Sequence, residues 1–276
     1  MSKRFLYISF GALAFSFIGF VISTLYLKSV ITDRRIPSVE EGEVLNIKIS
    51  EPQEGGTFNL PISIKGEARV FENVVSLKVL DEENNLLLQD FFMANSPDVG
   101  EFGNFSYVID TLLKEPVSDK IIIQVYWDSP RDGSPLDVVS IPVFLGDKNI
   151  KLAAYFGNSL LGSSDDCQKV FPLYRLTAKT EAIGAKSLSL LFNVFLSEEE
   201  KTAGYFSSLP EDAKLISLNI KDGAAYADFN SSFNSVGGSC RVSAIRSQIE
   251  NTLKQFSSVK KVVISANGDV ESALQP

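Results

Sequence analysis

The residues best suited to chemistry in this chain are two cysteines. Cys167 and Cys240 are the only cysteines among 276 residues, and the chain contains no histidine. The missing histidine excludes Ser-His-Asp and Cys-His nucleophilic systems and most zinc sites. In an exported domain, two cysteines most simply form a disulfide. Two buried reduced cysteines are the alternative, and thiol catalysis is disfavoured because no histidine is present to activate a thiolate.

Three aspartates are the carboxylates from which an acid–base pair could be built. A glycosidase needs two carboxyl groups on either side of the scissile bond, and Asp165, Asp166 and Asp228 are the candidates. The sequence does not show that any two of them converge, and Asp228 is more simply a structural carboxylate near the end of a hairpin. We therefore expect no catalytic residue, no cofactor and no enzymatic activity.

Acidic turns and one glycine-rich turn are the remaining candidate ligand sites. Calcium needs about six to eight oxygen ligands. Some of them could come from residues 81–83, or from Asp128, Asp132 and Asp137. The D-x-[DN]-x-[DN]-G spacing is absent, so solvated turns are the simpler interpretation and we expect no metal site. Residues 237–239 could receive an anion at a helix start, but no phosphate-binding loop motif is present, and a structural loop is the simpler interpretation.

One apolar stretch of 23 residues predicts where the chain resides. It begins at Phe5, ends at Leu27 and contains no charge, proline or amide side chain. A helix of this length spans roughly 35 Å, enough for a hydrocarbon core of about 30 Å. The sequence therefore predicts a single-pass transmembrane signal anchor in the cell membrane. A cleaved signal peptide is the alternative, but its apolar core is usually about 7–15 residues long.

The distribution of charge along the chain indicates a domain boundary, but the charges that flank the apolar stretch slightly favour the opposite orientation. Long domains are translocated largely regardless of flanking charge, so residues 1–35 are expected to hold a cytoplasmic tip and the anchor. Residues 36–43 are expected to link the anchor to the rest of the chain, which is predicted to lie outside the cytoplasm. Residues 36–149 carry 8 basic and 20 acidic side chains, whereas residues 150–276 carry 13 of each. The break indicates a domain boundary, and the acidic first part argues against nucleic acid.

Residues 44–146 have the pattern of an all-β domain. Apolar and polar residues alternate over seven short runs that are separated by Gly, Pro and Asp clusters. This period of two is typical of an antiparallel β-sandwich in which one face of each strand is core. The runs lie at residues 45–49, 62–65, 75–79, 86–88, 105–109, 121–127 and 139–143.

Residues 150–276 have the pattern of an α+β domain. Residues 182–196 and a segment capped by Ser239 show the apolar spacing of helices, and residues 197–210 are a polar excursion between elements. Two helices on a mixed sheet are the economical packing. The predicted strands lie at residues 150–156, 170–176, 214–221, 224–229 and 261–266, and the element order is β-β-α-β-β-α-β.

Two stretches of the first domain carry a family likeness. A G-x-A-x-x-F-E motif runs from Gly66 to Glu72, and WDSPRDGS begins at Trp127. With these motifs, residues 44–146 resemble the immunoglobulin-like domain of bacterial spore germination proteins. The resemblance implies an immunoglobulin-like sandwich that serves as an accessory module. The Cys…Trp…Cys core of antibody domains is absent here.

The second domain carries its own likeness. An E-x-x-x-G-Y-F-S-S-L-P stretch runs from Glu200 to Pro210, and the hairpin IKDGAAYADF begins at Ile220. With these motifs, residues 150–271 resemble the GerMN domain of sporulation and spore germination proteins. The resemblance implies an extracytoplasmic, envelope-associated module for binding or assembly.

These observations lead to three functional hypotheses. The first is a non-enzymatic, membrane-anchored protein that binds another envelope protein or assembles with itself, with Tyr205, Phe206 and Asp228 as the candidate binding surface. The second is a module for cell-wall polymer (peptidoglycan), in which Tyr205 and Phe206 stack on sugar rings. The third and least favoured is a wall hydrolase that uses Asp165, Asp166 or Asp228.

Overall fold

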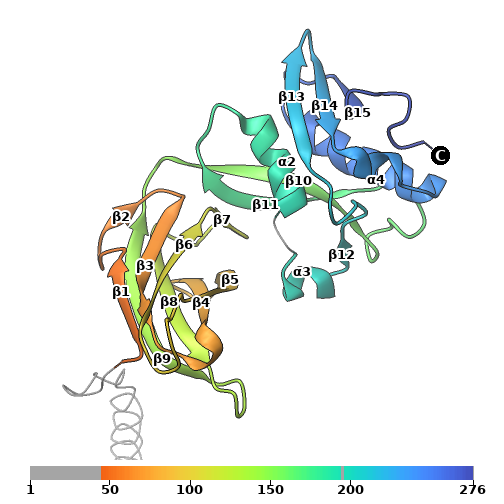
Figure 1. Cartoon of the computed structure of the whole chain (residues 1–276). Coiled ribbons are helices and arrows are strands. Elements are labelled where there is room, and N and C mark those ends of the chain that lie inside the picture. The colour runs from red at the N-terminus through yellow and green to blue at the C-terminus, as the bar shows by residue number, and fades with distance from the viewer. Residues whose placement is uncertain (1–44, 194–195, 276) are drawn as a thin grey trace, which may run out of the picture. The chain divides into compact units, whose positions relative to one another are not determined.

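Two modules follow one another along the chain. The computed structural model describes residues 45–193 and 196–275, and contacts join residues 46–276 into one unit. The sandwich module contains strands β1 to β9, and the α+β module contains strands β10 to β15 with helices α2, α3 and α4 (Figure 1).

Two sheets make up the sandwich module. One has the strand order β1-β3-β6, and the other has the order β2-β9-β8-β4-β5. Neighbouring strands in these sheets are antiparallel, except that β2 runs parallel to β9. The elements are β1 (Ile47–Glu51), β2 (Thr57–Phe58), β3 (Ile62–Ala68), the 3-10 helix η1 (Phe71–Asn73), β4 (Val74–Asp81), β5 (Leu86–Met93), β6 (Gly103–Ile109), β7 (Thr111–Leu112), β8 (Lys120–Asp128) and β9 (Pro135–Leu145).

The core of the sandwich module lies between its two sheets. On β8, the side chains of Ile121, Ile123 and Val125 are fully buried, while the alternate residues Ile122 and Gln124 keep partial contact with solvent. Burying one such aliphatic side chain stabilises the fold by about 1.5–3 kcal/mol. The period-two pattern of the sequence thus determines which face of each strand meets the opposite sheet.

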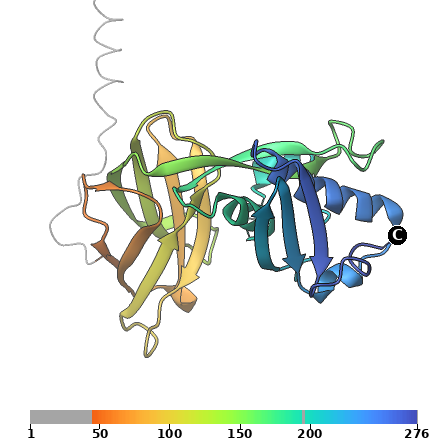
Figure 2. The ribbon, with the colours of Figure 1, turned by 90° about the horizontal axis from the view of Figure 1, so that it is seen from above.

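The α+β module combines two sheets with three described helices. Its first sheet has the order β12-β10-β11-β7 and its second the order β13-β14-β15. Helix α4 contacts β10, β15 and α2, and Figure 2 shows β13, β14 and β15 as neighbouring arrows beside these helices. The elements are β10 (Asn149–Asn158), β11 (Phe171–Ala178), α2 (Ile183–Asn193), α3 (Glu198–Thr202), β12 (Tyr205–Phe206), β13 (Leu215–Lys221), β14 (Ala224–Phe229), η2 (Ser231–Asn234), α4 (Ser239–Lys254) and β15 (Lys261–Ala266).

Helix α4 provides the main apolar stripe of the α+β module. Ile245, Ile249 and Leu253 are fully buried on one face, at the spacing that the sequence predicts. The predicted cap is wrong: Ser239 is the first helical residue, and Gly238 takes the N-cap position with a φ of 90°. Glycine suits this position because it has no Cβ to clash in the left-handed region.

The predicted fold class needs correction. Residues 45–193 and 196–275 form a β-rich fold, and no helix among them is long and apolar enough to cross a membrane. The segment from Phe5 to Leu27, for which the sequence predicts a transmembrane helix, lies outside the described residues. The α+β module also has three helices where two were predicted, and two sheets where one mixed sheet was predicted.

Candidate functional site at the module junction

The two modules share a pair of strands. Leu112 of β7 lies opposite Leu176 of β11, and Thr111 lies opposite Thr177. Leu112 and Leu176 are both buried in the hydrophobic core of the sandwich module. A side chain from β11 therefore completes the core of the neighbouring module, and the backbone joins both modules in one sheet.

Three lysine–carboxylate ion pairs cross the same junction among the described residues. The pairs of Lys114 and Lys151 are exposed and contribute about 0–1 kcal/mol each, because water and salt screen their charges. They add orientation to the strand pair more than stability. The pairs are Lys114–Glu199 with 3.1 Å between Nζ and Oε2, Lys151–Glu115 with 2.9 Å between Nζ and Oε2, and Lys186–Asp110.

Arg175 of β11 is a buried cation, with 1% of its surface exposed. Its Nη1 and Nη2 donate to Glu200 Oε1 and Oε2 at 2.6 and 2.9 Å, which makes the ion pair bidentate. Nη1 also donates to the carbonyl of Leu113 in the sandwich module at 3.0 Å. Nε has no hydrogen-bond partner among the described residues. One guanidinium therefore links β11, α3 and the sandwich module.

Helix α3 positions the carboxylate of this pair through its own N-terminus. Ser197 Oγ accepts the N–H of Glu200 at 3.2 Å, and Glu200 Oε2 accepts the N–H of Ser197 at 2.9 Å. These reciprocal bonds form a capping box. The Glu200 side chain is only 15% exposed, so the cap and the guanidinium hold it in one orientation.

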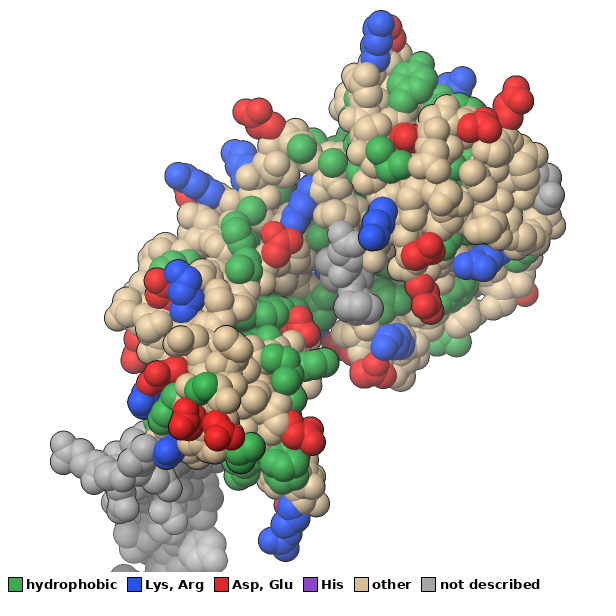
Figure 3. Space-filling view, in the orientation of Figure 1, with side chains coloured by type: hydrophobic (Ala, Val, Ile, Leu, Met, Phe, Trp, Pro, Cys, Tyr) green, Lys and Arg blue, Asp and Glu red, His purple; other side chains and the backbone are tan. Residues whose placement is uncertain are grey.

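A cleft of about 850 Å³ lies at this junction and is lined by both modules. The Arg175–Glu200 pair forms part of its lining. Figure 3 shows hydrophobic and acidic side chains interspersed on the face around β5 and the junction. Most of the other lining side chains are aliphatic or aromatic, among them Leu86, Leu88 and Tyr107 of the sandwich module and Leu173, Leu190 and Tyr205 of the α+β module.

A hydrogen-bonded tyrosine stands on the sandwich side of the cleft. Tyr107 O–H donates to Asp90 Oδ2 at 2.5 Å, and Asp90 Oδ1 accepts the N–H of Phe91 at 2.8 Å. Burial, and then the bond to Asp90, raise the pKa of Tyr107 above its ordinary value. Its ring stacks on Phe92 with 5.1 Å between centroids. Tyr107 therefore remains a protonated, fixed donor at neutral pH.

The three residues of the predicted binding surface have different surroundings. Tyr205 lines the cleft. Phe206 lies over Gly157, where an added Cβ would come within 2.5 Å of its ring. Asp228 Oδ1 accepts the hydroxyl of Ser265 at 2.6 Å, which ties β14 to β15. Of the three residues, only Tyr205 belongs to the cleft.

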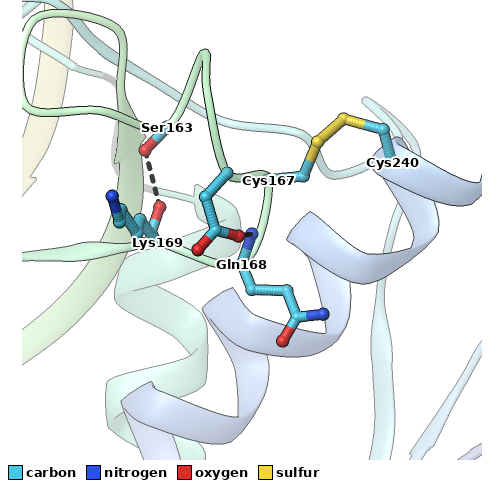
Figure 4. The surroundings of a disulfide bond; sticks show 6 residues. Ser163, Cys167, Gln168, Lys169 and Cys240 are labelled. Atoms are coloured by element: carbon cyan, nitrogen blue, oxygen red, sulfur yellow. Dashed lines mark hydrogen bonds between the residues drawn. A yellow bond between two sulfur atoms is a disulfide. The ribbon is translucent and has the colours of Figure 1, made fainter.

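The structure joins Cys167 and Cys240 in a disulfide, the pairing that the sequence predicts (Figure 4). Their Cα atoms are 5.5 Å apart. Cys167 lies between β10 and β11, and Cys240 lies in the first turn of α4, so the bond fastens a loop to a helix. In the same loop, Asp166 Oδ1 accepts the N–H of Gln168 at 3.0 Å. This carboxylate stabilises the turn next to the disulfide.

The acidic turns are engaged in local hydrogen bonds. Burial by itself raises the pKa of Asp81, but bonds from the Asn85 side chain and from backbone N–H groups outweigh it and lower the pKa. Asp137 Oδ2 accepts Trp127 Nε1–H at 2.7 Å. Within the part of the chain that the structure describes, no three potential metal ligands gather into a site.

The sequence does not reveal Arg175 as a junction residue. It stands in a short apolar run, VFPLYRL, and its partners Leu113 and Glu200 are far from it in the chain. Helix α3 did have a signal, because S-x-x-E from Ser197 to Glu200 is the capping-box pattern.

Comparisons with known proteins agree with the two family likenesses. Residues 46–134 match the immunoglobulin-like domain of bacterial spore germination, and residues 155–271 match the family described as sporulation and spore germination. No curated protein matches the chain significantly.

Two solved structures from Bacillus subtilis are similar to part of the chain. The tandem GerMN domains of the sporulation protein GerM are 24% identical, with a TM-score of 0.32, over 44% of this chain and 40% of that one. The first GerMN domain of the same protein is 23% identical, with a TM-score of 0.33, over 44% of this chain and 85% of that one. The chain thus spans less than half of the tandem-domain structure.

Proposed function

We propose that this protein has a non-enzymatic, protein-binding function outside the cytoplasm. The chain carries an immunoglobulin-like domain of bacterial spore germination, followed by a sporulation and spore germination domain. The partner protein binds at the cleft between the modules. The observation that carries this proposal is the junction itself: a shared strand pair and the buried Arg175–Glu200 pair hold a cleft that neither module forms alone.

Rigidity of the junction favours binding. A preformed site avoids part of the entropy that a flexible site loses when it orders around a partner. Here the strand pair, the capping box and the bidentate ion pair order the walls in advance. The mostly apolar lining, with a few fixed polar groups, is the usual composition of a binding site.

The placement outside the cytoplasm is supported by the disulfide. Disulfides persist in oxidising compartments and are rare in the reducing cytoplasm. The bond between Cys167 and Cys240 fastens the loop after β10 to α4, so folding of the α+β module is coupled to its formation.

Two of the three carboxylates that a wall hydrolase would use have structural roles. Asp228 is held by Ser265, and Asp166 is held by its own turn. These bonds give both aspartates a structural use.

Cross-linking in cells tests the proposal. The full-length protein is cross-linked, purified under denaturing conditions, and the attached peptides are identified by mass spectrometry. We expect a defined partner protein whose links fall on both modules beside the cleft. Capture of wall fragments alone would refute protein binding and favour the peptidoglycan hypothesis.

A further inference from the structure

The lining of the cleft identifies a class of partner. We propose that the cleft holds an extended peptide segment of the partner protein that carries aliphatic side chains next to lysine or arginine. This inference rests on the proposed function, because it names the segment that the protein-binding cleft recognises.

The volume and lining of the cleft suit a short peptide segment. Ligand sites commonly measure about 300–1,000 Å³, and this cleft measures about 850 Å³. Leu86 and Leu88 line it on the sandwich side, and Leu173 and Leu190 line it on the other side. Branched aliphatic side chains of a partner would bury their surface between these two walls.

The charges that line the cleft are mainly negative. Glu198 and Glu199 stand in the first turn of α3 with side chains that are 88% and 77% exposed. Each has a lysine neighbour within its module or across the junction, yet a carboxylate offers lone pairs for more than one donor. An excess of one sign of charge along a cleft attracts ligands of the opposite sign. The lining contains the carboxylates Asp90, Asp110, Glu198, Glu199 and Glu200 against the cations Lys114 and Arg175, while Lys186 and Lys201, outside the lining, pair with Asp110 and Glu198.

The sandwich module adds a wider negative field. Residues 45–146 carry 16 acidic and 7 basic side chains. An acidic peptide, a nucleic acid or an anionic polymer approaching the cleft meets this field and is repelled. A segment with lysine or arginine is attracted, which commits the occupant to a basic sequence.

The charge of the buried cation in the lining is neutralised within the protein. Arg175 lines the cleft, and its charge is already matched by Glu200. Because Arg175 and Glu200 neutralise each other, the guanidinium does not oppose the approach of a basic segment.

Fluorescence anisotropy with the full-length protein tests this inference. The probe is an end-blocked, labelled peptide of about eight residues, roughly 26 Å when extended, in which leucine and lysine alternate. Two matched peptides replace lysine by glutamate or leucine by serine. We expect saturable binding of the leucine–lysine peptide and at least about tenfold weaker binding of both others.

Charge reversal locates the binding. The variant Glu198→Lys/Glu199→Lys should weaken the leucine–lysine peptide about tenfold, because two attractions become repulsions. The control Glu211→Lys/Asp212→Lys makes the same charge change at exposed positions outside the cleft lining and should leave affinity within about twofold. Melting temperatures of both variants exclude misfolding as the cause.

Three outcomes would overturn the inference. Equal weakening by both double variants would show attraction by net charge alone. Equal binding of the leucine–glutamate peptide would remove the basic requirement. Self-association that displaces the peptide would make a second copy the occupant. Cross-linking in cells separates the two proposals. If the wild-type protein captures a partner through an acidic segment, the inference of a basic segment is wrong and the proposed protein-binding function stands. If it captures no protein, the proposed function fails.

Discussion

Replacing Glu200 by glutamine should destabilise the protein far more than the same change one residue earlier. Glu200 accepts two bonds from Arg175 and one from the N–H of Ser197. In Glu200→Gln the guanidinium of Arg175 stays buried without its counter-charge. The N–H₂ group of the new amide then lies where an N–H donor needs an acceptor. Removing one partner of a buried pair costs about 3–5 kcal/mol. Since Glu200 is 15% exposed, we expect the lower end, about 3 kcal/mol.

The matched control is Glu199→Gln. Glu199 stands on the same helix at the same junction, but its side chain is 77% exposed and pairs with Lys114 on the surface. Exposed pairs contribute about 0.2–1 kcal/mol. The two variants make the same chemical change, so the difference between them measures the effect of burial.

Equilibrium urea unfolding provides the measurement. Fluorescence of Trp127, the only tryptophan, reports on the sandwich module, and far-ultraviolet circular dichroism reports on the whole chain. A loss of about 3 kcal/mol corresponds to a fall in melting temperature of about 6–12 °C in a unit of this size. The variant Arg175→Met/Glu200→Leu should recover part of the lost stability, because it removes the uncompensated charge but also the bonds to Ser197 N–H and to the Leu113 carbonyl.

Two results would refute this reasoning. If Glu200→Gln and Glu199→Gln are equally stable, the guanidinium is not held as a buried charge. If the apolar double variant is no more stable than Glu200→Gln, the loss does not come from an uncompensated charge.

Three further predictions concern other parts of the fold. Replacing Cys167 and Cys240 by serine should lower the free energy of unfolding by about 4 kcal/mol or less, because the bond joins residues 73 positions apart. Urea unfolding of the variant, and of the wild type with and without reductant, measures this loss. Gly157→Ala should cost about 1 kcal/mol or less, because the atoms that a new Cβ would meet are the far end of the exposed Phe206 ring; a loss of about 3 kcal/mol or more in urea unfolding would show that the ring cannot move aside. The pKa of Asp81 is lowered in the folded state, so the stability that Asp81 contributes is present above about pH 4 and is lost as the pH falls below it. The variant Asp81→Asn should therefore be less stable than the wild type at pH 7. Its stability should also change less with pH in the acid range.

The sandwich strands could be predicted because their pattern is local. On β8 the alternation places Ile121, Ile123 and Val125 inward without reference to any other part of the chain. The disulfide could be predicted for a different reason: with only two cysteines, Cys167 and Cys240 have one possible pairing.

The junction could not be predicted because its contacts are distant in sequence. β7 has two residues, Thr111 and Leu112, too few for a periodic signal, and its partner is in the other module. From its sequence context, Arg175 cannot be distinguished from a surface arginine on a half-exposed strand. Its burial becomes evident only from its bonds to Leu113 and Glu200 in the folded structure. The spacing of apolar residues reports which face of an element is buried, and it carries no information about which distant element covers that face.

The short strand pair and the buried ion pair complement each other. A two-residue ladder fixes the register of β7 against β11 but leaves little to resist bending about that contact. The guanidinium of Arg175 reaches both Glu200 on α3 and the carbonyl of Leu113, at points away from the ladder. Because its bonds are directional, they restrict orientation as well as distance. A buried ion pair is weak evidence for stability but a sound means of orientation, and orientation determines whether the walls of the cleft stand at a fixed separation for a partner segment.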